Sequence, residues 1–337
     1  MNSTNSSISP VSKGETQRPL LSFVLVAYNQ ERFIREAVDA ALSQTYSPLE
    51  IILSDDGSKD ATFTIIQEMA QAYSGPHRVI CNRNEKNLGI GNHINKVLSL
   101  ATGEWAVVAA GDDISFPERT EVLFQYIARN PDVRAIGSNS ALIDEMGREV
   151  VNGRRHQQVD AFPMREFMQR GWYLTGGCAM AYHRQCWEPY PPINANVIGE
   201  DLVLPFRGAM FGRMALLKDD LVCYRSMPTG LASHFKRRLP PDDPTVNQLV
   251  SDVKALADRG MISQGKAAHL EKELIRYGKY RYYFIQEPVT LSSWFNAMRH
   301  LSLRKDTGFL LKQAYRAVRH LGRRGLRGLR VIGVGKR

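Results

Sequence analysis

Two adjacent carboxylates, Asp112 and Asp113, follow the apolar run 105–110, and their residue types and position suit them to chemistry. An ionised carboxylate taken out of water costs several kcal/mol unless it is paired, hydrogen-bonded or bound to a metal. At the carboxyl end of a strand in an open α/β sheet, such a pair suits a divalent cation that carries a phosphorylated ligand. The alternative interpretation is a solvated turn that caps a helix beginning near residues 117–118.

Two further acidic segments occur in comparable settings. The sequence Asp-Asp-Gly-Ser at 55–58 follows the apolar run 49–53, although its residue types also suit a simple tight turn. The pair Glu200-Asp201 follows a glycine and precedes an apolar stretch, where acids also favour the N-terminus of a helix. Acidic residues at several such positions indicate a ligand-binding edge more strongly than any one pair does.

Apolar runs and helical patterns alternate along the first third of the chain. A helical pattern follows each of the first three predicted strands, and the strands are expected at 20–26, 49–53, 79–81 and 105–109. The third helix is expected to stop at Gly103. The glycines at 89 and 91 are a weak phosphate-loop signal, for which an ordinary loop is the alternative. The alternation predicts βαβ units in a doubly wound sheet, which binds ligands outside the carboxyl ends of its strands.

The composition is that of a globular protein able to bury a full core, with 43% hydrophobic and 23% charged residues among 337. The whole chain has a net charge of +10. Residues 299–337 hold twelve Lys or Arg and one acid, a charge of +11, so the rest of the chain carries −1. The rest is close to neutral, which argues against nucleic-acid binding and for an anionic partner of the tail. The four cysteines show no metal-like spacing and suit a reducing compartment. No apolar run approaches the ~20 residues of a membrane span, and we predict no secretory signal.

Five motifs stand in a fixed order along the chain: Val-Ala-Tyr-Asn at 26–29, Leu-Ser-Asp-Asp-Gly-Ser-x-Asp at 53–60, Asn-x-Gly at 87–89, Ala-x-Gly-Glu-Trp at 101–105 and Gly-Asp-Asp-x-x-x-Pro-Glu-Arg at 111–119. Together they resemble family 2 glycosyltransferases with the GT-A fold, over roughly residues 20–225. The resemblance implies an α/β protein with a doubly wound mixed sheet and a nucleotide-binding half. One departure is Ala110, where many members carry another Asp.

On the donor side, the resemblance implies that the loops after the first two strands hold the nucleotide base and ribose. A carboxylate there can accept the imide N–H of uracil, with Asp55 and Asp56 as alternatives. Asp113 would bind Mn²⁺ or Mg²⁺, which take oxygen ligands together with substrate phosphates. The implied nucleotide-binding residues are Ala27, Tyr28, Asn29, Asp55, Asp56 and, facing the ribose, Asp112.

On the acceptor side, the resemblance implies that Asp201 is the catalytic base of an inverting transfer and that Glu200 binds or orients the acceptor. The segment 174–180 would be an acceptor-side strand, in which Gly176 and Gly177 let a sugar approach the backbone; a core strand is the alternative. Trp187 either lines the acceptor site or belongs to the core.

A second departure is Met227, where relatives often carry a histidine two residues after the arginine at 225. His234 is then the candidate metal ligand, with a solvated loop histidine as the alternative. The chain is divided into a disordered lead at 1–19, a GT-A domain at 20–239, a helical region at 240–321 and a basic tail at 322–337. Apolar and basic residues interleaved beyond 294 suit either an interfacial helix on anionic lipid or a helix docked on the core.

The function implied is a metal-dependent, inverting hexosyltransferase that uses a UDP-sugar. Its acceptor would be a saccharide or a lipid-linked saccharide, in bacterial surface-polysaccharide biosynthesis. The expected location is the cytoplasm, peripherally on the inner face of the plasma membrane. The alternative is a non-catalytic nucleotide-binding or membrane-scaffold protein on the same fold. A nucleotidyltransferase is disfavoured because segment 27–30 is not a glycine-rich loop bearing Lys or Arg.

Overall fold

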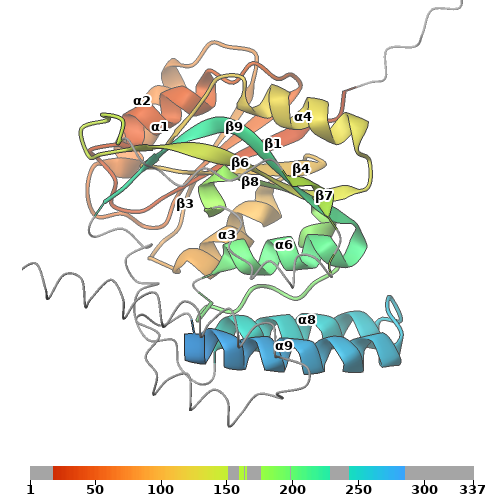
Figure 1. Ribbon diagram of the computed structural model, residues 1–337. Helices are drawn as coiled ribbons and strands as arrows, with labels where there is room; N and C mark the ends of the chain where they lie inside the picture. Colours follow the sequence, from red (N-terminus) through yellow and green to blue (C-terminus); the bar gives the residue numbers. More distant parts are fainter. Residues whose placement is uncertain are drawn as a thin grey trace, which may run out of the picture.

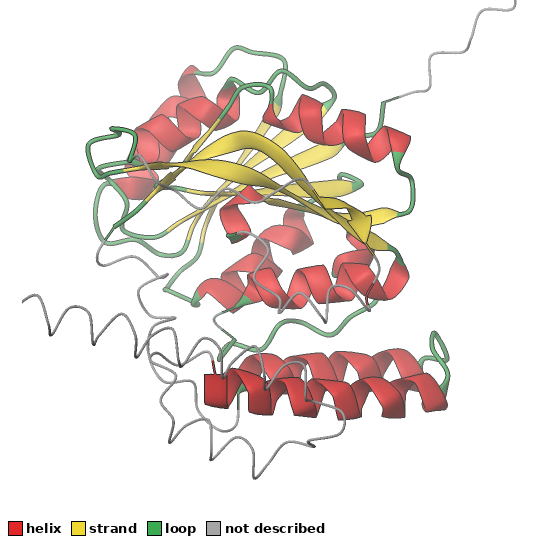
Figure 2. Cartoon of the chain, in the orientation of Figure 1, coloured by secondary structure: helices red, strands yellow, loops and turns green. Residues whose placement is uncertain are grey.

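A twisted mixed sheet forms the centre of the protein, with the strand order β3-β2-β1-β4-β8-β6-β9-β5 and with β7 paired to β9 (Figure 1). The computed structural model describes residues 18–150, 159–162, 164, 176–197, 199–227 and 243–284. Helices lie on both faces of the sheet (Figure 2). This arrangement confirms the α/β class that the alternating sequence pattern predicts.

The N-terminal half is built from βα units. The parallel strands are β1 (Leu21–Ala27), β2 (Leu49–Asp55), β3 (Arg78–Arg83) and β4 (Trp105–Ala110). They are connected by α1 (Ile34–Leu42), α2 (Thr62–Ala72) and α3 (Ile90–Leu100). In the β1–β2 and β1–β4 registers, Leu21 stands opposite both Leu49 and Trp105. The carboxyl ends of β1, β2 and β4 therefore reach the same edge of the sheet.

Gly103 does not end the third helix as predicted. The helix ends at Leu100, and Ala101 is already extended, with φ −70° and ψ 125°. A Cβ on Gly103 would lie 2.7 Å from the backbone of both Leu21 and Ser22. The glycine is therefore explained by a close crossing over the start of β1 rather than by helix termination.

The second half adds antiparallel pairing. Its elements are β5 (Ile114–Ser115), α4 (Arg119–Arg129), β6 (Val133–Ile143), β7 (Val159–Phe162), β8 (Met180–His183), α6 (Glu200–Phe211) and β9 (Arg213–Arg225). Strand β8 lies antiparallel between β4 and β6. A 3₁₀ turn at Gly177–Ala179 precedes it, so the strand predicted at 174–180 begins only at Met180. Residues 165–175 lie outside the described ranges.

Alternating side chains of β1 divide the apolar core into two layers. Phe23 and Leu25 pack with the residues of α1, α2 and α4, whereas Val24 and Val26 pack with those of α3 and α6. The second layer continues into α8 (Pro244–Asp258) and α9 (Gln264–Phe284), a helical hairpin beneath α6 (Figure 1). Both helices fall where the sequence pattern predicts helix.

Among the described residues, no helix combines the length and the apolar character that crossing a membrane requires. Residues 1–17 and 285–337 lie outside the described ranges. The basic tail and most of the predicted N-terminal lead therefore belong to the undescribed part of the chain.

Candidate active site

The loops that follow β1 and β2 are tied to each other at the carboxyl edge of the sheet. The Asn29 N–H donates to Ser58 Oγ at 2.8 Å, and the Asn29 side-chain oxygen accepts from the Lys59 N–H at 3.0 Å. Asn29 has a φ of +52°, a region that asparagine tolerates better than most residues. The side chain of Tyr28 is left 39% exposed beside this junction. Its ring can therefore offer a face to a flat ligand.

Asp55 is wholly buried and shapes its own loop. Its carboxylate accepts hydrogen bonds from the N–H and the hydroxyl of Ser58 and lies 3.5 Å from Arg83 Nε. A carboxylate engaged in this way fixes the turn after β2 in one conformation. Asp55 thus fixes the shape of the loop that follows β2.

Asp56 joins the end of β2 to the segment that enters α3. Its Oδ1 accepts from the Asn84 amide at 2.8 Å and from the Leu88 N–H at 2.9 Å, and its Oδ2 accepts from the Gly89 N–H at 3.1 Å. The Asp56 N–H in turn donates to the Ala27 carbonyl at 2.9 Å. Three of the roughly four lone-pair sites of this carboxylate are therefore occupied within the protein.

The acidic pair at the end of β4, Asp112 and Asp113, is buried and hydrogen-bonded to its neighbours. Asp113 is 5% exposed; its Oδ1 accepts from the Arg225 N–H at 2.8 Å, and the Cys178 thiol also donates to its carboxylate. Burial, aided by the charge of Asp112, raises the pKa of Asp113 to about 7. Burial also raises the pKa of Asp112. Two carboxylates in this state gain stability from a cation placed against them.

Gln30 connects this pair to the nucleotide-side loops. Its side chain hydrogen-bonds to Asp112, and its Oε1 accepts from the Tyr28 N–H at 3.4 Å. A Cβ on Gly111 would lie 2.4 Å from Gln30 Oε1 and 2.8 Å from the Ala27 Cβ. Glycine is therefore needed before the acidic pair so that the pair can approach the end of β1. Sequence inspection did not single out Gln30, because its partner lies eighty residues away.

Two buried arginines, Arg225 and Arg119, lie close to the acidic pair and place positive charge beside it. Arg225 Nε donates to the Asp112 carbonyl at 2.9 Å, and its Nη2 donates to Glu36 at 2.8 Å. Arg119 donates to the Val108 carbonyl at 2.8 Å, and burial lowers its pKa to about 10, so it remains charged at neutral pH. Neither arginine was predicted to take part, although the Pro-Glu-Arg motif contains one of them.

The second acidic pair lies at the start of α6, against the 3₁₀ turn before β8. A Cβ on Gly177 would lie 2.8 Å from Glu200 Oε1 and 3.4 Å from the Asp201 Cβ. Burial, together with the charge of Asp201, raises the pKa of Glu200 well above its ordinary value. The pair can therefore offer a carboxyl that retains its proton beside one that accepts a proton.

Tyr224 links the two acidic pairs in space. Burial first, and then the charges of Cys178, Asp113, Asp112 and Asp201, raise the pKa of its hydroxyl to about 12. Adjacent residues of the turn before β8 join the two pairs, because Gly177 lies against Glu200 and Asp201 while the Cys178 thiol donates to Asp113. The end of β4 and the start of α6 thus lie close together.

Trp187 is not brought to this edge. Strand β8 runs antiparallel to β4 and pairs His183 with Trp105, the first residue of β4. The chain therefore leaves β8 at the opposite edge of the sheet, and Trp187 packs half-buried against the apolar core. Its packing is that of a core side chain. Gly176 is exposed directly before the 3₁₀ turn, whereas His234 lies outside the described residues.

Within the described ranges, no three His, Cys, Asp or Glu side chains converge closely enough to hold a metal ion by themselves. The pair Asp112–Asp113 nevertheless fits a hard divalent cation, because it supplies oxygen donors whose ionisation burial and mutual repulsion oppose. A cation held there needs further ligands from substrate phosphates and water. The residues present therefore fit a metal that arrives with its substrate.

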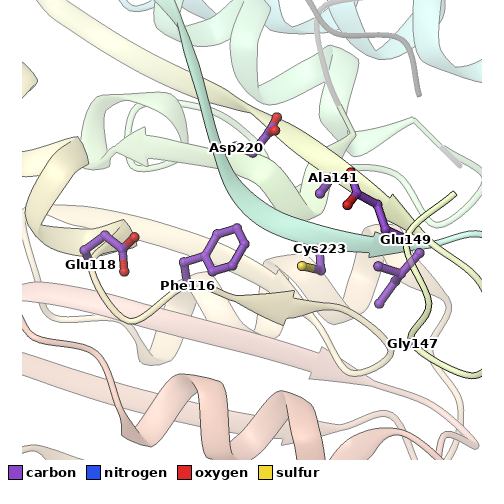
Figure 3. A pocket seen from close by; sticks show the side chains of 8 residues that line it. Phe116, Glu118, Ala141, Gly147, Glu149, Asp220 and Cys223 are labelled. Atoms are coloured by element: carbon purple, nitrogen blue, oxygen red, sulfur yellow. The ribbon is translucent and has the colours of Figure 1, made fainter. Parts of the chain in front are cut away.

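A separate hollow of about 470 Å³ lies beside β5 and β9 (Figure 3). Its lining residues are Phe116, Glu118, Ala141, Ile143, Gly147, Glu149, Asp220 and Cys223. None of the predicted site residues belongs to it.

The chain matches the family described as "Glycosyl transferase family 2" over residues 22–186. An uncharacterised protein of Mycobacterium tuberculosis is 34% identical over 218 residues, which are 63% of this chain and 60% of that relative. The chain thus spans about 60% of the length of that relative.

Among solved structures, TarS of S. aureus in complex with UDP-GlcNAc has a TM-score of 0.58 at 16% identity, over 88% of each chain. The mannosyltransferase PcManGT of Pyrobaculum calidifontis, in complex with GDP-Man and Mn²⁺, has a TM-score of 0.54 at 17% identity. That match covers 90% of this chain and 81% of PcManGT. These likenesses confirm the predicted GT-A fold.

Proposed function

Because this chain belongs to glycosyl transferase family 2, we propose that it transfers a sugar from a nucleotide-diphosphate donor to an acceptor hydroxyl with inversion at the transferred carbon. The observation that carries the proposal is the closeness of the Asp112–Asp113 pair and Asp201, which the adjacent residues Gly177 and Cys178 join. A site of this kind needs one group that receives the diphosphate and another that removes a proton. We propose that the pair at 112–113 and the pair at 200–201 supply these two groups.

The donor nucleotide is proposed to lie over the tied loops after β1 and β2. The exposed ring of Tyr28 can stack on the base, and the loops around Asn29 and Asp56 give the base and ribose a fixed frame. TarS was solved with UDP-GlcNAc and PcManGT with GDP-Man, which supports a nucleotide-sugar donor. We propose a UDP-sugar because the carboxylate of Asp56, which keeps one of its roughly four lone-pair sites, suits the imide N–H of uracil, whereas Asp55 is wholly buried.

We propose that Asp113, with Asp112 beside it, holds Mn²⁺ or Mg²⁺ together with the donor diphosphate. The presence of Mn²⁺ in the PcManGT complex supports this choice of ion. When bound, such a cation offsets the negative charge that develops on the diphosphate leaving group. In this chain, Arg225 fixes Asp113 through its N–H, so that one carboxylate oxygen is oriented before the ion arrives.

Asp201 is the proposed general base. The acceptor oxygen attacks the anomeric carbon of the donor sugar, its proton passes to Asp201, and the bond from that carbon to the diphosphate oxygen breaks. The raised pKa of the neighbouring Glu200 lets that residue keep a proton and donate a hydrogen bond to the acceptor. The nucleoside diphosphate leaves from the side of Asp112 and Asp113.

The acceptor and the cellular place are further parts of the proposal. We propose a saccharide or lipid-linked saccharide acceptor in bacterial surface-polysaccharide biosynthesis, on the cytoplasmic side of the membrane. The support is the basic segment 299–337, whose twelve Lys or Arg suit an anionic lipid surface.

Shape-matched substitutions of the two key carboxylates test the proposal. We expect Asp201→Asn to lower kcat by about 10²–10⁴-fold, because the acceptor proton loses its base, while UDP binding is retained. We expect Asp113→Asn to abolish the Mn²⁺ dependence of UDP binding in titration calorimetry. Asp258→Asn, at an exposed position of α8, is the matched control. If Asp201→Asn keeps near wild-type turnover, Asp201 is not the base. If the wild type binds UDP but shows no turnover, the non-catalytic alternative is favoured.

A further inference from the structure

A buried ion pair joins the helix that begins with Glu200–Asp201 to the C-terminal hairpin. Arg207 on α6 donates from Nε to Asp252 Oδ2 at 2.7 Å and from Nη2 to Asp252 Oδ1 at 2.8 Å. The two side chains are 1% and 0% exposed. This parallel two-point contact fixes the orientation of α6 against α8 as well as their distance.

The pair is fully supported by its neighbours. Arg207 Nη2 also donates to the Pro191 carbonyl at 2.8 Å, and the Gln248 amide donates to Asp252 Oδ1 at 2.9 Å. The ring of Tyr190 lies 4.7 Å from the guanidinium carbon. Apolar residues of similar volume often stabilise a core as well as a buried ion pair does. The pair is therefore better explained by the geometry it imposes than by the stability it adds.

The start of α6 depends on such external support. Pro205 stands within the helix and has no N–H to donate to the carbonyl of Asp201, four residues earlier. The turn that carries the two acids thus lacks one of its helical hydrogen bonds. Arg207 follows Asp201 by six residues, about 9 Å along the axis, so a shift of α6 at Arg207 is transmitted to the acids.

The same network extends to the nucleotide side. The Asn194 N–H donates to Gln248 Oε1 at 2.8 Å, so the segment before α6 is fastened to α8. Asn95 on α3 exchanges two hydrogen bonds with the backbone of Ile193, at 2.7 and 2.9 Å. Helix α3 in turn begins directly after Gly89, whose N–H donates to Asp56. Helix α8 is thus connected to both halves of the site.

We propose that α8 sets the position of Asp201 relative to the nucleotide side of the site, with Arg207 and Asp252 as positioning residues. Neither residue touches substrate in this proposal; each acts through the placement of α6. The inference rests on the function proposed above and deepens it. It makes the C-terminal hairpin a working part of the transfer site.

The first test uses Asp252→Asn, which keeps the shape of the side chain but removes its charge. We expect kcat for sugar transfer to fall by about 10- to 100-fold, as for a displaced catalytic group, while the donor KM stays within about twofold. Glu271→Gln is the matched control, because Glu271 on α9 forms a partly exposed ion pair with Lys254 of α8, at 3.5 Å, and this pair does not reach α6. The control is expected to keep wild-type kcat and KM. Equal kcat in Asp252→Asn and wild type overturns the proposal.

A second variant separates positioning from stability, because breaking one partner of a buried pair can also unfold the protein. The double substitution Arg207→Met with Asp252→Leu removes both charges and is expected to restore the melting temperature but not kcat. Recovery of kcat to within about twofold of wild type overturns the proposal.

Hydrogen–deuterium exchange of residues 199–203 gives a readout that needs no activity. Faster exchange there in both variants than in Glu271→Gln supports the coupling, and unchanged exchange overturns it. If the wild type transfers no sugar, the proposed function fails while the exchange experiment still decides the coupling.

Discussion

At the scale of single residues, Gly177 lies directly against the two acids at the start of α6. A Cβ there would stand 2.8 Å from Glu200 Oε1, closer than real Cβ atoms approach a neighbour, whereas a Cβ on Gly176 would meet nothing nearer than Cys178 Sγ at 3.6 Å. The two neighbouring glycines therefore differ in the space available to a methyl group. Only at Gly177 would an added methyl group collide with an acidic side chain of α6.

We predict that Gly177→Ala lowers kcat by about 10- to 100-fold, because the methyl group displaces the carboxyl of Glu200 from its place beside Asp201. Gly176→Ala measures the effect of an added methyl group without that contact and is expected to cost less. Steady-state kinetics of both variants, at a temperature well below their melting points, decide the matter. An equal loss in the two variants contradicts the displacement of Glu200.

The carboxylates at 55–56 and 112–113 could be predicted because each pair stands in a short polar loop directly after an apolar run, whereas Glu200 and Asp201, at the start of a helix, were singled out by the family resemblance. Gln30 and Arg225 could not, because their meaning lies in contacts with Asp112 and Asp113, which are distant in sequence. Trp187 was ambiguous for the same reason. Only the antiparallel direction of β8 shows that it leaves the acidic edge.

At the scale of elements, Glu50 on β2 joins the N-terminal ends of β1, β2 and β4, at the edge of the sheet opposite the site. It accepts from Ser22 Oγ on β1 at 2.6 Å and from the N–H and hydroxyl of Thr102 at 2.6 and 2.8 Å. Burial opposes the ionisation of Glu50, but these hydrogen bonds outweigh burial and lower its pKa below the ordinary value. The connection from α3 to β4 is thereby fixed to β1 and β2.

We predict that Glu50 makes stability pH-dependent in acid. Since its folded pKa is the lower one, its contribution is present above the unfolded pKa of ~4.3 and is lost as the pH falls through the folded pKa. Glu50→Gln should lower stability at pH 7 by about 1–3 kcal/mol and flatten the fall of the melting temperature between about pH 5 and 3. Glu68→Gln, at an exposed position of α2, is the control. Identical acid profiles for wild type and Glu50→Gln would contradict this role.

Strands β1, β2 and β4 were predictable because each is buried on both faces and reads as an apolar run, and β3, which is partly exposed, was predictable from a shorter run. The order of the remaining strands was not, because β8 enters between β4 and β6 from a segment far along the chain. Gly103 illustrates a local limit of sequence reasoning. A glycine after a helix suggests termination, whereas this one makes room for the backbone of β1.

At the scale of the whole molecule, one apolar layer runs from the sheet through α3 and α6 into the C-terminal hairpin. Val24, Ile94, Leu202, Leu249 and Leu274 all belong to it. The hairpin is thus part of the body that holds the site rather than an appendage. The strong positive charge lies beyond it, in residues 299–337, while the remaining chain is close to neutral.

The membrane association proposed above predicts that the charge of the tail, and not that of the body, drives binding to anionic lipid. Each Lys or Arg near an anionic surface contributes about 1 kcal/mol, so replacing Arg323, Arg324, Arg327 and Arg330 by Gln should weaken binding to vesicles containing phosphatidylserine by about two to three orders of magnitude. The matched control replaces Arg35, Lys96, Lys218 and Lys254 by Gln, which removes the same charge from the body. Cosedimentation at low and high salt measures the effect, because screening shortens the reach of the surface field. Equal binding by the two variants, or equal binding of the wild type to neutral vesicles, would show that the tail does not act through its charge.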